Sequence, residues 1–442
     1  MKQLLDNLKR AYRHSFMSKL SWWKTACALA LFCAATAIAS PAQPFTPLCK
    51  FVGGGNADTG LVQGTDGSLY GTTRGSAFPG AYPGGISRSV NWSEFGFIPS
   101  GGRFNPHERM LSPSNAHQLH MLWSFFTGCS GAFCGGSSAT VVNGVVYVGS
   151  YDGYVYALNA ATGDQLWSFL TGGEVFSSPA VADGVVYVGS NDQNVYALNA
   201  ATGAELWSYT TGYDVVSSPA VANGVVYIGS EDGSVYALNA ATGAKLWSYS
   251  THLVVDSSPA LANGIVYIGS DDGNLYALNA ATGAKLWSFS TAGDVYSSPA
   301  VANGVVYVGS EDGNVYALNA TTGVKLWSYT SPTRDYVNSS PAVANGVVYV
   351  GSIDDNVYAL NAATGAKLWS YTTRNNVLSS PAVANGVVYI GSEDDSVYAL
   401  NATTGAKLWS YHTGNQVFSS PTVANGVVYV GSGDGNMYAF GL

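Results

Sequence analysis

One aspartate recurs in each of eight similar segments of the chain, and recurring carboxylates are the first candidates for chemistry. They are Asp152, Asp192, Asp232, Asp272, Asp312, Asp354, Asp394 and Asp434. Carboxylate oxygens are the ligands that Ca²⁺ prefers, so a calcium site is one interpretation. Aspartate is also favoured in tight turns, where its side chain accepts hydrogen bonds from nearby backbone N–H groups. Because the residue recurs at one place in every segment, we interpret it as a turn residue and predict no metal ligands.

A nucleophilic or thiol-based site needs a base or a second ligand nearby, and the chain offers few of either. His252 and His412 are the only histidines in the repeated segments, and they stand in different copies. Cys129 and Cys134 bracket a short loop and could pair as a disulfide after export, which would leave Cys49 over. We therefore predict no catalytic residues and no cofactor-binding residues.

The composition of the 442-residue chain narrows the class of protein. Only 10% of the residues are charged and 47% are apolar, with 53 Gly, 29 Tyr and 11 Trp. A charge-rich disordered chain is excluded, and so is a helix-rich protein, because Gly and Tyr favour turns and strands. Residues 137–442 hold seven Lys and Arg against 22 Asp and Glu, so they offer no basic surface for nucleic acid.

Positive charge is concentrated at the N-terminus, in the pattern of a targeting segment. Residues 1–50 hold seven Lys and Arg and one acidic residue. The apolar run from Thr25 to Ala39 ends in small residues and is shorter than the ~20 residues of a spanning helix. This pattern is typical of a secretory signal peptide, so we expect cleavage within residues 1–42 and an exported protein without a transmembrane domain. An uncleaved N-terminal anchor is the alternative.

The rest of the chain is built from one repeat. Its Ser-Ser pairs begin at residues 137, 177, 217, 257, 297, 339, 379 and 419, in steps of 40 residues with one step of 42. In one copy, residues 217–222, 225–230, 235–239 and 245–249 read as four short strands separated by Asn-Gly, Asp-Gly and Ala-Thr-Gly turns. Four strands in a repeat of this length predict the blade of a β-propeller.

The number of copies predicts how the ring closes. The first strand of each copy carries Pro and small residues, which suit an edge near a crowded axis, so the Trp strand is outermost. The first Trp strand, around Trp123, precedes the first Ser-Ser pair, and no Trp strand follows the last copy, which starts at Ser419. We predict an all-β, eight-bladed propeller over residues 119–442, closed by pairing of the N-terminal Trp strand with the C-terminal three strands.

Two sets of motifs resemble a known family. The string Ala-Leu-Asn-Ala-Ala-Thr-Gly-Ala-Lys-Leu-Trp at residues 237–247 resembles the Trp-docking motif of pyrroloquinoline quinone (PQQ) type propellers. Residues 91–97, 103–106 and 111–115 resemble the segment that leads into quinoprotein dehydrogenase propellers, so 91–118 is interpreted as this segment. The resemblance covers residues 91–442 and implies that the repeated tryptophans stack between blades: Trp123, Trp167, Trp207, Trp247, Trp287, Trp327, Trp369 and Trp409.

The resemblance extends to both enzymes and non-enzymatic relatives, including an outer-membrane assembly lipoprotein. The enzymes need Ca²⁺ held by unique ligands, an Asp base and usually two adjacent cysteines. Here the inner strands are nearly uniform, and Cys129 and Cys134 are not adjacent. Neither PQQ nor Ca²⁺ is therefore expected as a cofactor. Residues 48–81, which include the motif at 61–73, resemble one copy of a Gly-rich extracellular repeat, and we interpret 43–90 as a Gly/Pro-rich lead-in of low order.

The eight copies differ most in the loops that connect each Trp strand to the next Ser-Ser pair. Mixed aromatic, acidic and amide side chains on such loops suit a partner-binding face, although drift between duplicated copies would also explain them. The candidates are Glu174, Phe176, Tyr213, Asp214, Asp256, Asp294, Tyr296, Arg334, Asp335, Tyr336, Arg374, Asn376, Gln416 and Phe418.

From these features we predict an exported, non-catalytic protein-binding scaffold in the periplasm, at the outer surface or in the extracellular space. A carbohydrate-binding propeller is the second hypothesis, because exposed Tyr and Phe beside Asn and Asp suit sugar rings. A PQQ- and Ca²⁺-dependent alcohol or sugar dehydrogenase is the third.

Overall fold

The computed structural model describes residues 62–63, 69–70, 91–129 and 137–442, and the chain divides into two units, 1–85 and 86–442. In the first unit, β1 (Val62–Gln63) pairs antiparallel with β2 (Leu69–Tyr70). The predicted signal segment 1–42 and most of 43–90 lie outside the described residues, so those assignments stay predictions. Within the described residues, no helix combines the length and apolar character needed to cross a membrane.

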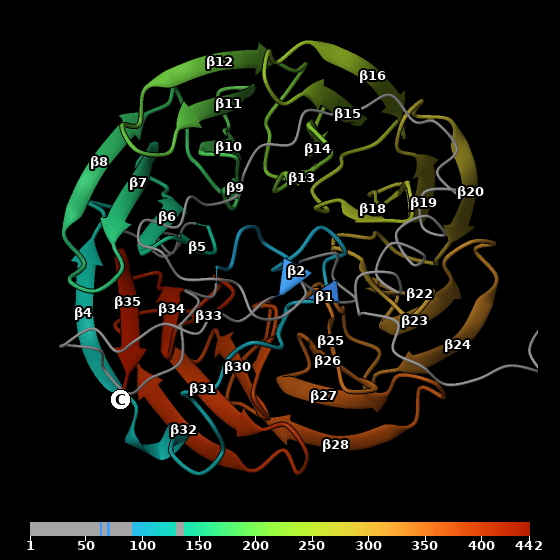
Figure 1. Cartoon of the computed structure of the whole chain (residues 1–442). Coiled ribbons are helices and arrows are strands. Elements are labelled where there is room, and N and C mark those ends of the chain that lie inside the picture. The colour runs from blue at the N-terminus through green and yellow to red at the C-terminus, as the bar shows by residue number, and fades with distance from the viewer. Residues whose placement is uncertain (1–61, 64–68, 71–90, 130–136) are drawn as a thin grey trace, which may run out of the picture. The chain divides into compact units, whose positions relative to one another are not determined.

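Residues 120–126 and 140–441 form eight four-stranded antiparallel sheets arranged in a ring, as the eight-bladed prediction required (Figure 1). The innermost strands are β5 (Thr140–Val142), β9 (Ala180–Ala182), β13 (Ala220–Ala222), β17 (Ala260–Ala262), β21 (Ala300–Ala302), β25 (Ala342–Ala344), β29 (Ala382–Ala384) and β33 (Thr422–Ala424). The second strands are β6 (Val145–Gly149), β10 (Val185–Gly189), β14 (Val225–Ser230), β18 (Ile265–Gly269), β22 (Val305–Gly309), β26 (Val347–Gly351), β30 (Val387–Ser392) and β34 (Val427–Gly431).

The two remaining strands of each blade lie toward the rim. The third strands are β7 (Tyr154–Asn159), β11 (Asn194–Asn199), β15 (Ser234–Asn239), β19 (Asn274–Asn279), β23 (Asn314–Asn319), β27 (Asn356–Asn361), β31 (Ser396–Asn401) and β35 (Asn436–Gly441). The outermost strands are β8 (Gln165–Leu170), β12 (Glu205–Thr210), β16 (Lys245–Ser250), β20 (Lys285–Ser290), β24 (Lys325–Thr330), β28 (Lys367–Thr372), β32 (Lys407–His412) and β4 (His120–Phe126). We number the blades 1 to 8 in this order, so blade 8 contains β4.

The first strand of each copy is shorter than expected. Only the three residues after Ser-Ser-Pro pair with the second strand, as in Ala220–Ala222. Pro has no N–H to donate, and the N–H of the preceding Ser points sideways to the next blade. Ser218, for example, donates its N–H to Oγ of Ser258 at 3.0 Å.

The ring closes as predicted. β4 pairs antiparallel with β35, and Trp123 lies opposite Ala439. Blade 8 therefore combines three strands from the C-terminus with one strand from the start of the propeller, which leaves no blade short of a strand.

The repeated tryptophans dock each blade onto the next one. Seven of them, from Trp123 to Trp369, donate their Nε1–H to an Ala carbonyl of the following blade at 2.9–3.1 Å. A Cβ built on Gly163, whose φ is +77°, would lie 2.8 Å from the Trp123 ring, so the turn must be Gly where the indole stacks. Trp409 differs, because its ring packs edge-on against Phe440 with 5.0 Å between centroids.

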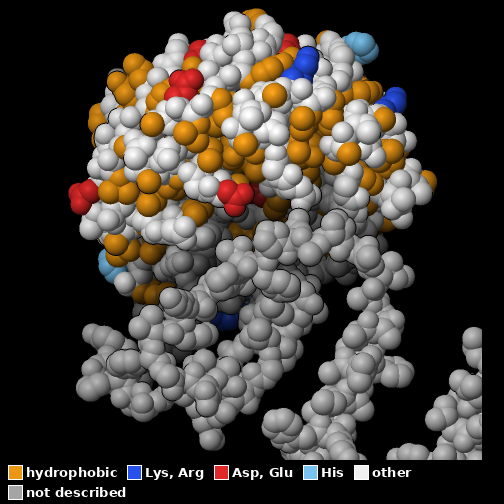
Figure 2. All heavy atoms as spheres, turned by 45° about the horizontal axis from the view of Figure 1, so that its top comes forward, with side chains coloured by type: hydrophobic (Ala, Val, Ile, Leu, Met, Phe, Trp, Pro, Cys, Tyr) orange, Lys and Arg blue, Asp and Glu red, His pale blue; other side chains and the backbone are white. Residues whose placement is uncertain are grey.

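The outer strands alternate between the core and solvent. In β16, Trp247 is buried while Leu246 on the other side of the strand is 51% exposed. On the surface shown in Figure 2, apolar side chains are accordingly spread over the rim, and charged side chains are few and scattered.

Residues 91–108, here the axial segment, run through the middle of the ring and contact every blade (Figure 1). The segment includes β3 (Phe104–Asn105), which adds a parallel strand to β29, and it is followed by a short 3₁₀ helix, η1 (Ala116–Gln118). Each innermost strand is an edge strand whose free N–H or C=O needs a partner. The axial segment supplies these partners.

Successive residues of the axial segment bind successive blades around the axis. Backbone carbonyls of the axial segment accept N–H groups from the innermost strands of six blades, from Val141 N–H to Trp92 O in blade 1 to Val383 N–H to Arg103 O in blade 7. In blade 3 the acceptor is instead Oε2 of Glu94, which lies 3.3 Å from the N of Val221. In blade 8, Nδ2 of Asn105 donates to the Val423 carbonyl at 2.8 Å.

Candidate functional site

The propeller has two faces with different residues. The constant face carries the Asn-Gly turns and the Ala-Thr-Gly loops, which are joined by hydrogen bonds such as Ala200 N–H to Gly184 O at 2.9 Å. The variable face carries the loops between blades and the turns between second and third strands, joined for example by Glu231 N–H to Asp214 O.

The axial segment is attached at the constant-face end of the axis. Asn91 exchanges hydrogen bonds with Asn143, and Oε2 of Glu108 accepts the N–H of Gly426; both partners belong to Asn-Gly turns. The mouth ringed by variable loops therefore lies at the opposite end of the axis.

All the predicted partner-binding residues lie in the loops between blades, on the variable face. Tyr213 and Tyr336 are the most exposed aromatic side chains among them, at 54% and 46%. Arg334 adopts a φ of +62°, and its loop is the one lengthened by two residues in the repeat. Whether these residues bind a partner stays a prediction.

The structure adds a second set of variable residues that the sequence interpretation missed. Each lies directly before the recurring Asp in the turn between second and third strands, and in blades 2 to 8 its backbone N–H donates to the neighbouring variable loop. The backbone N–H of Glu231 donates to the carbonyl of Asp214, that of Asp271 to the carbonyl of Val254, and that of Glu311 to the carbonyl of Asp294. A sequence signal was present, because this position varies among the blades while the Asp after it does not: Tyr151, Asn191, Glu231, Asp271, Glu311, Ile353, Glu393 and Gly433.

Together the two sets form an acidic arc across blades 2 to 5. Burial, together with the smaller effects of the charges on Glu231, Asp271 and Asp214, raises the pKa of Asp256 to about 7. Burial also raises the pKa of Asp271 to about 6, against a hydrogen bond from Tyr296 that lowers it. The arc consists of Glu174, Asp214, Glu231, Asp256, Asp271, Asp294 and Glu311. These carboxylates repel one another, so a cationic surface would be favoured against them.

The other side of the variable face combines arginine and amide side chains with carboxylates. Arg334 and Arg374 stand in the loops before blades 6 and 7. Nδ2 of Asn376 donates to Oε2 of Glu393 at 3.1 Å, so that carboxylate is partly satisfied within the protein. The face therefore has two electrostatically different halves on rigid loops.

The recurring aspartates act in the structure itself. In blade 2, Oδ2 of Asp192 accepts the hydroxyl of Tyr196 and the N–H of Gly172, each at 2.6 Å. The Asp–Tyr contact recurs in all eight blades. These carboxylates thus tie the blade to the loop before it, and no group of three or more His, Cys, Asp or Glu among the described residues could hold a metal ion.

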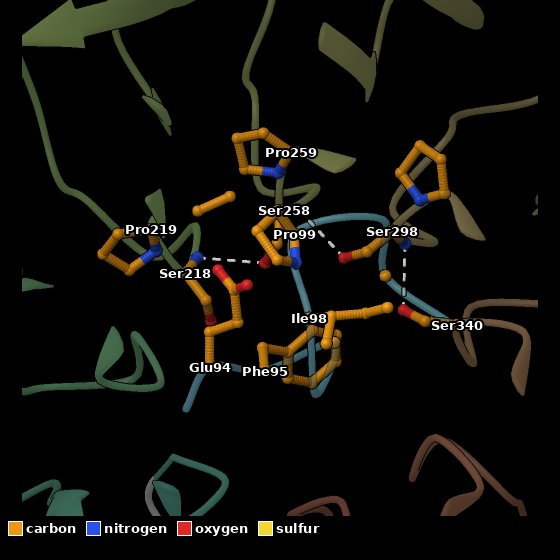
Figure 3. Close-up of a pocket in the computed structure, with 14 residues that line it drawn as sticks. Glu94, Phe95, Ile98, Pro99, Ser218, Pro219, Ser258, Pro259, Ser298 and Ser340 are labelled. Atoms are coloured by element: carbon orange, nitrogen blue, oxygen red, sulfur yellow. Dashed lines mark hydrogen bonds between the residues drawn. The ribbon is translucent and has the colours of Figure 1, made fainter. Parts of the chain in front are cut away.

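The resemblance to quinoprotein dehydrogenases implies that a fused-ring quinone could bind at the axis, so the size of the cavity there decides whether PQQ fits. Glu94, Phe95, Ile98 and Pro99 of the axial segment lie inside the ring of Ser-Pro pairs (Figure 3). The cavity left between them has a volume of about 10 Å³, which is about enough for one water molecule. Pockets for cofactor-sized ligands are roughly 300–1,000 Å³. This cavity does not fit PQQ, and no reaction step can be derived through it.

Two ionisable side chains of the axial segment are fully enclosed. Burial raises the pKa of Glu94 to about 8, with the Val221 N–H lowering it in part. Burial lowers the pKa of Arg103 to about 9, and its guanidinium donates to the carbonyls of Pro381 at 2.9 Å and Pro421 at 2.8 Å. These contacts link the segment to blades 7 and 8 and leave neither group accessible to a substrate.

Cys129 is disulfide-bonded. Its predicted partner, Cys134, lies outside the described residues, as does Cys49.

The propeller matches a known protein family and resembles several solved structures. Residues 120–253, 232–342 and 334–441 match the family described as outer membrane protein assembly factor BamB. A solved structure of BamB from Moraxella catarrhalis is 22% identical and superimposes with a TM-score of 0.63, covering 73% of this chain and 98% of that one. A quinohemoprotein alcohol dehydrogenase from Pseudomonas putida is 18% identical with a TM-score of 0.70, covering 80% of each chain.

A curated protein also matches over a short stretch. The β-alanine-activating enzyme of Danio rerio is 54% identical over 43 residues, which are 10% of this chain. The match spans only 4% of that enzyme's length.

Proposed function

Because the chain belongs to the family of the outer membrane protein assembly factor BamB, we propose that it is a non-catalytic scaffold that binds a protein partner. The observation that carries this proposal is the gathering of the variable residues of all copies on one face. Near-identical blades hold them on short, hydrogen-bonded loops, which suits binding to a large partner.

The proposed partner surface is the variable face, with two contributions. Exposed Tyr213 and Tyr336 offer the large amphipathic side chains that dominate binding energy in protein interfaces. The acidic arc adds charge that would steer and orient a partner with a basic surface. The constant face, with its repeated Asn-Gly turns, offers no such blade-specific pattern.

The proposal includes export to the cell envelope or the extracellular space. It rests on the pattern of residues 1–42, with charged residues before a short apolar run. The disulfide at Cys129 supports an oxidising compartment.

The third hypothesis, a PQQ-dependent dehydrogenase, is disfavoured. The structural likeness to quinoprotein dehydrogenases concerns the fold, and the axial segment fills the cavity at the axis down to about 10 Å³. Carbohydrate binding by the variable loops is the alternative, because Tyr213 and Tyr336 are exposed beside acidic side chains.

Site-specific photo-crosslinking tests the partner face. A benzophenone amino acid would replace Tyr213 or Tyr336 on the variable face, and Thr242 or Thr322 in exposed Ala-Thr-Gly loops as matched controls. We expect one adduct of the same mass from both variable-face positions in producing cells, and none from the controls. Adducts from the controls alone, or equal adducts from all four positions, would contradict the proposal.

A further inference from the structure

A groove with a volume of about 390 Å³ lies between blades 6 and 7, near the rim. Tyr371 and Thr372 at the end of β28 form one wall, and Lys407, Ser410 and His412 of β32 form the other. Arg374, in the loop between the blades, lines the same space. Its volume falls within the range of about 300–1,000 Å³ that is typical of sites for small ligands.

Three basic side chains meet in this groove, on a propeller that is acidic as a whole. Arg374, Lys407 and His412 are all exposed. Lys407 has equivalents in four other blades, so Arg374 and His412 distinguish this groove. The position of His412 is Leu, Phe or a hydroxyl residue in the other blades: Phe126, Leu170, Thr210, Ser250, Ser290, Thr330 and Thr372.

The position of Arg374 also differs among the blades. In the loops of the same length it is Gly172, Gly212, His252, Ala292 and Gly414. The groove between blades 6 and 7 is therefore the one in this repeat that combines Arg, Lys and His at the three positions. The grooves between the other blades are natural comparisons, with the same backbone and fewer charges.

Asp394, a carboxylate bound to two lining residues of the groove, already accepts two hydrogen bonds. Oδ2 of Asp394 accepts the hydroxyl of Tyr398 at 2.5 Å and the backbone N–H of Arg374 at 3.0 Å. Burial and the charge of Asp394 raise the pKa of Tyr371, and the charge of Arg374 opposes them. The guanidinium thus lies close to the aromatic wall.

The remaining lining is apolar and hydroxylic. Tyr371 is half-buried, with its ring 5.5 Å from that of Tyr398 at 58° between the planes. Thr372 and Ser410 are both exposed. The Thr372 hydroxyl donates to Oδ1 of Asn356 at 2.6 Å and can still accept a hydrogen bond, whereas the Ser410 hydroxyl can both donate and accept. A ring with an apolar face, next to hydroxyls and cations, suits a ligand that is itself partly apolar, hydroxylated and negatively charged.

We propose that this groove binds an acidic saccharide, with the sugar carboxylate on Arg374. The planar guanidinium can donate two parallel hydrogen bonds to a carboxylate, and Lys407 and His412 add positive charge on the opposite wall. The Thr372 and Ser410 hydroxyls pair with sugar hydroxyls, and the Tyr371 ring packs against the sugar. The site shares Arg374 with the variable face but lies between blades 6 and 7, whereas the acidic arc lies across blades 2 to 5.

Calorimetric titration of the purified protein with digalacturonate at fixed ionic strength tests the site. We expect saturable binding, and a loss of about tenfold or more in affinity for Arg374→Gly and His412→Thr, since a hydrogen bond to a charged group is worth about 1.5–3 kcal/mol. Both variants install residues that equivalent positions already carry. Lys367→Ala, in the groove between blades 5 and 6, is the matched control and should leave the affinity unchanged.

A neutral sugar and small anions distinguish the contribution of the sugar ring from that of the carboxylate. A neutral digalactoside should bind at least about tenfold more weakly than digalacturonate, because it lacks the carboxylate. Acetate and inorganic phosphate should compete only at much higher concentrations, because they offer nothing to Tyr371. Equal affinity for the neutral sugar, equal affinity for phosphate alone, or an unchanged affinity in both groove variants would each overturn the proposal.

Discussion

The backbone N–H of Ser420 donates a hydrogen bond to Oγ of Ser138 at 2.9 Å, although 282 residues separate them. It is the last link in a closed circle of eight such bonds around the axis. In each link the second Ser of one Ser-Ser pair donates to the second Ser of the next blade at 2.9–3.0 Å. The ring is thus closed at the axis by Ser138 and at the rim by pairing of β35 with β4.

Removing the Ser138 hydroxyl should destabilise the propeller. Ser138→Ala leaves the buried N–H of Ser420 without its acceptor, which costs about 1–3 kcal/mol of the free energy of unfolding. Urea unfolding followed by tryptophan fluorescence measures the effect. Ser288→Ala, on the exposed side of β20, is the control and should cost less than about 0.5 kcal/mol. Equal unfolding midpoints for the two variants would mean that the serine circle does not stabilise the closed ring.

The docking tryptophans should not be equivalent. Trp247→Phe removes the hydrogen bond from Nε1 to the Ala280 carbonyl, whereas Trp409 packs against Phe440 without a corresponding bond to an Ala carbonyl. Trp247→Phe should therefore lower the free energy of unfolding by about 1 kcal/mol more than Trp409→Phe. The same unfolding assay compares the two variants. A larger loss in Trp409→Phe would show that ring packing alone, and not the hydrogen bond, governs docking.

Glu94 should make stability depend on pH. Burial raises its pKa in the folded protein from 4.5 to about 8, so the folded state holds the proton more strongly than the unfolded chain. Its contribution is fully present below pH 4.5 and is lost as the pH rises through about 8. The wild type should therefore lose stability relative to Glu94→Gln between these values.

The comparison isolates Glu94 from other buried acids. Asp256 and Asp271, with pKa values raised to about 7 and 6, act in the same direction and are present in both proteins. Asp164→Asn, at an exposed loop position, should keep the wild-type pH dependence. Parallel pH profiles for wild type and Glu94→Gln would contradict the assignment of a buried, proton-holding Glu94.

Much of the fold could be predicted because the repeat shows it directly. The spacing of the Ser-Ser pairs and the offset of Trp123 determine the number of blades and the closing strand, and both are confirmed. The path of the axial segment could not be predicted, because its residues do not repeat. Its hydrogen bonds reach the eight blades through different backbone and side-chain groups, a pattern with no period in the sequence.

The candidate site was predicted in part for a related reason. Loop residues such as Tyr213 stand out because they differ between copies, and the structure places them on one face. Glu231, Asp271 and Glu311 were missed because the Asp that follows each of them recurs in every copy, so the whole turn was interpreted as constant. Only the hydrogen bonds between turn and loop show that both sets share the variable face.

Titration of the purified protein with PQQ, with and without Ca²⁺, tests most directly whether the propeller is a scaffold or a quinoprotein. The cavity of about 10 Å³ beside Glu94 and Phe95 predicts no saturable heat with PQQ, while a PQQ-binding dehydrogenase run in parallel should give a full isotherm. Circular dichroism should show a folded β-protein before and after the titration. Calcium-dependent binding near one equivalent of PQQ would contradict the non-catalytic account and require the axial segment to move aside.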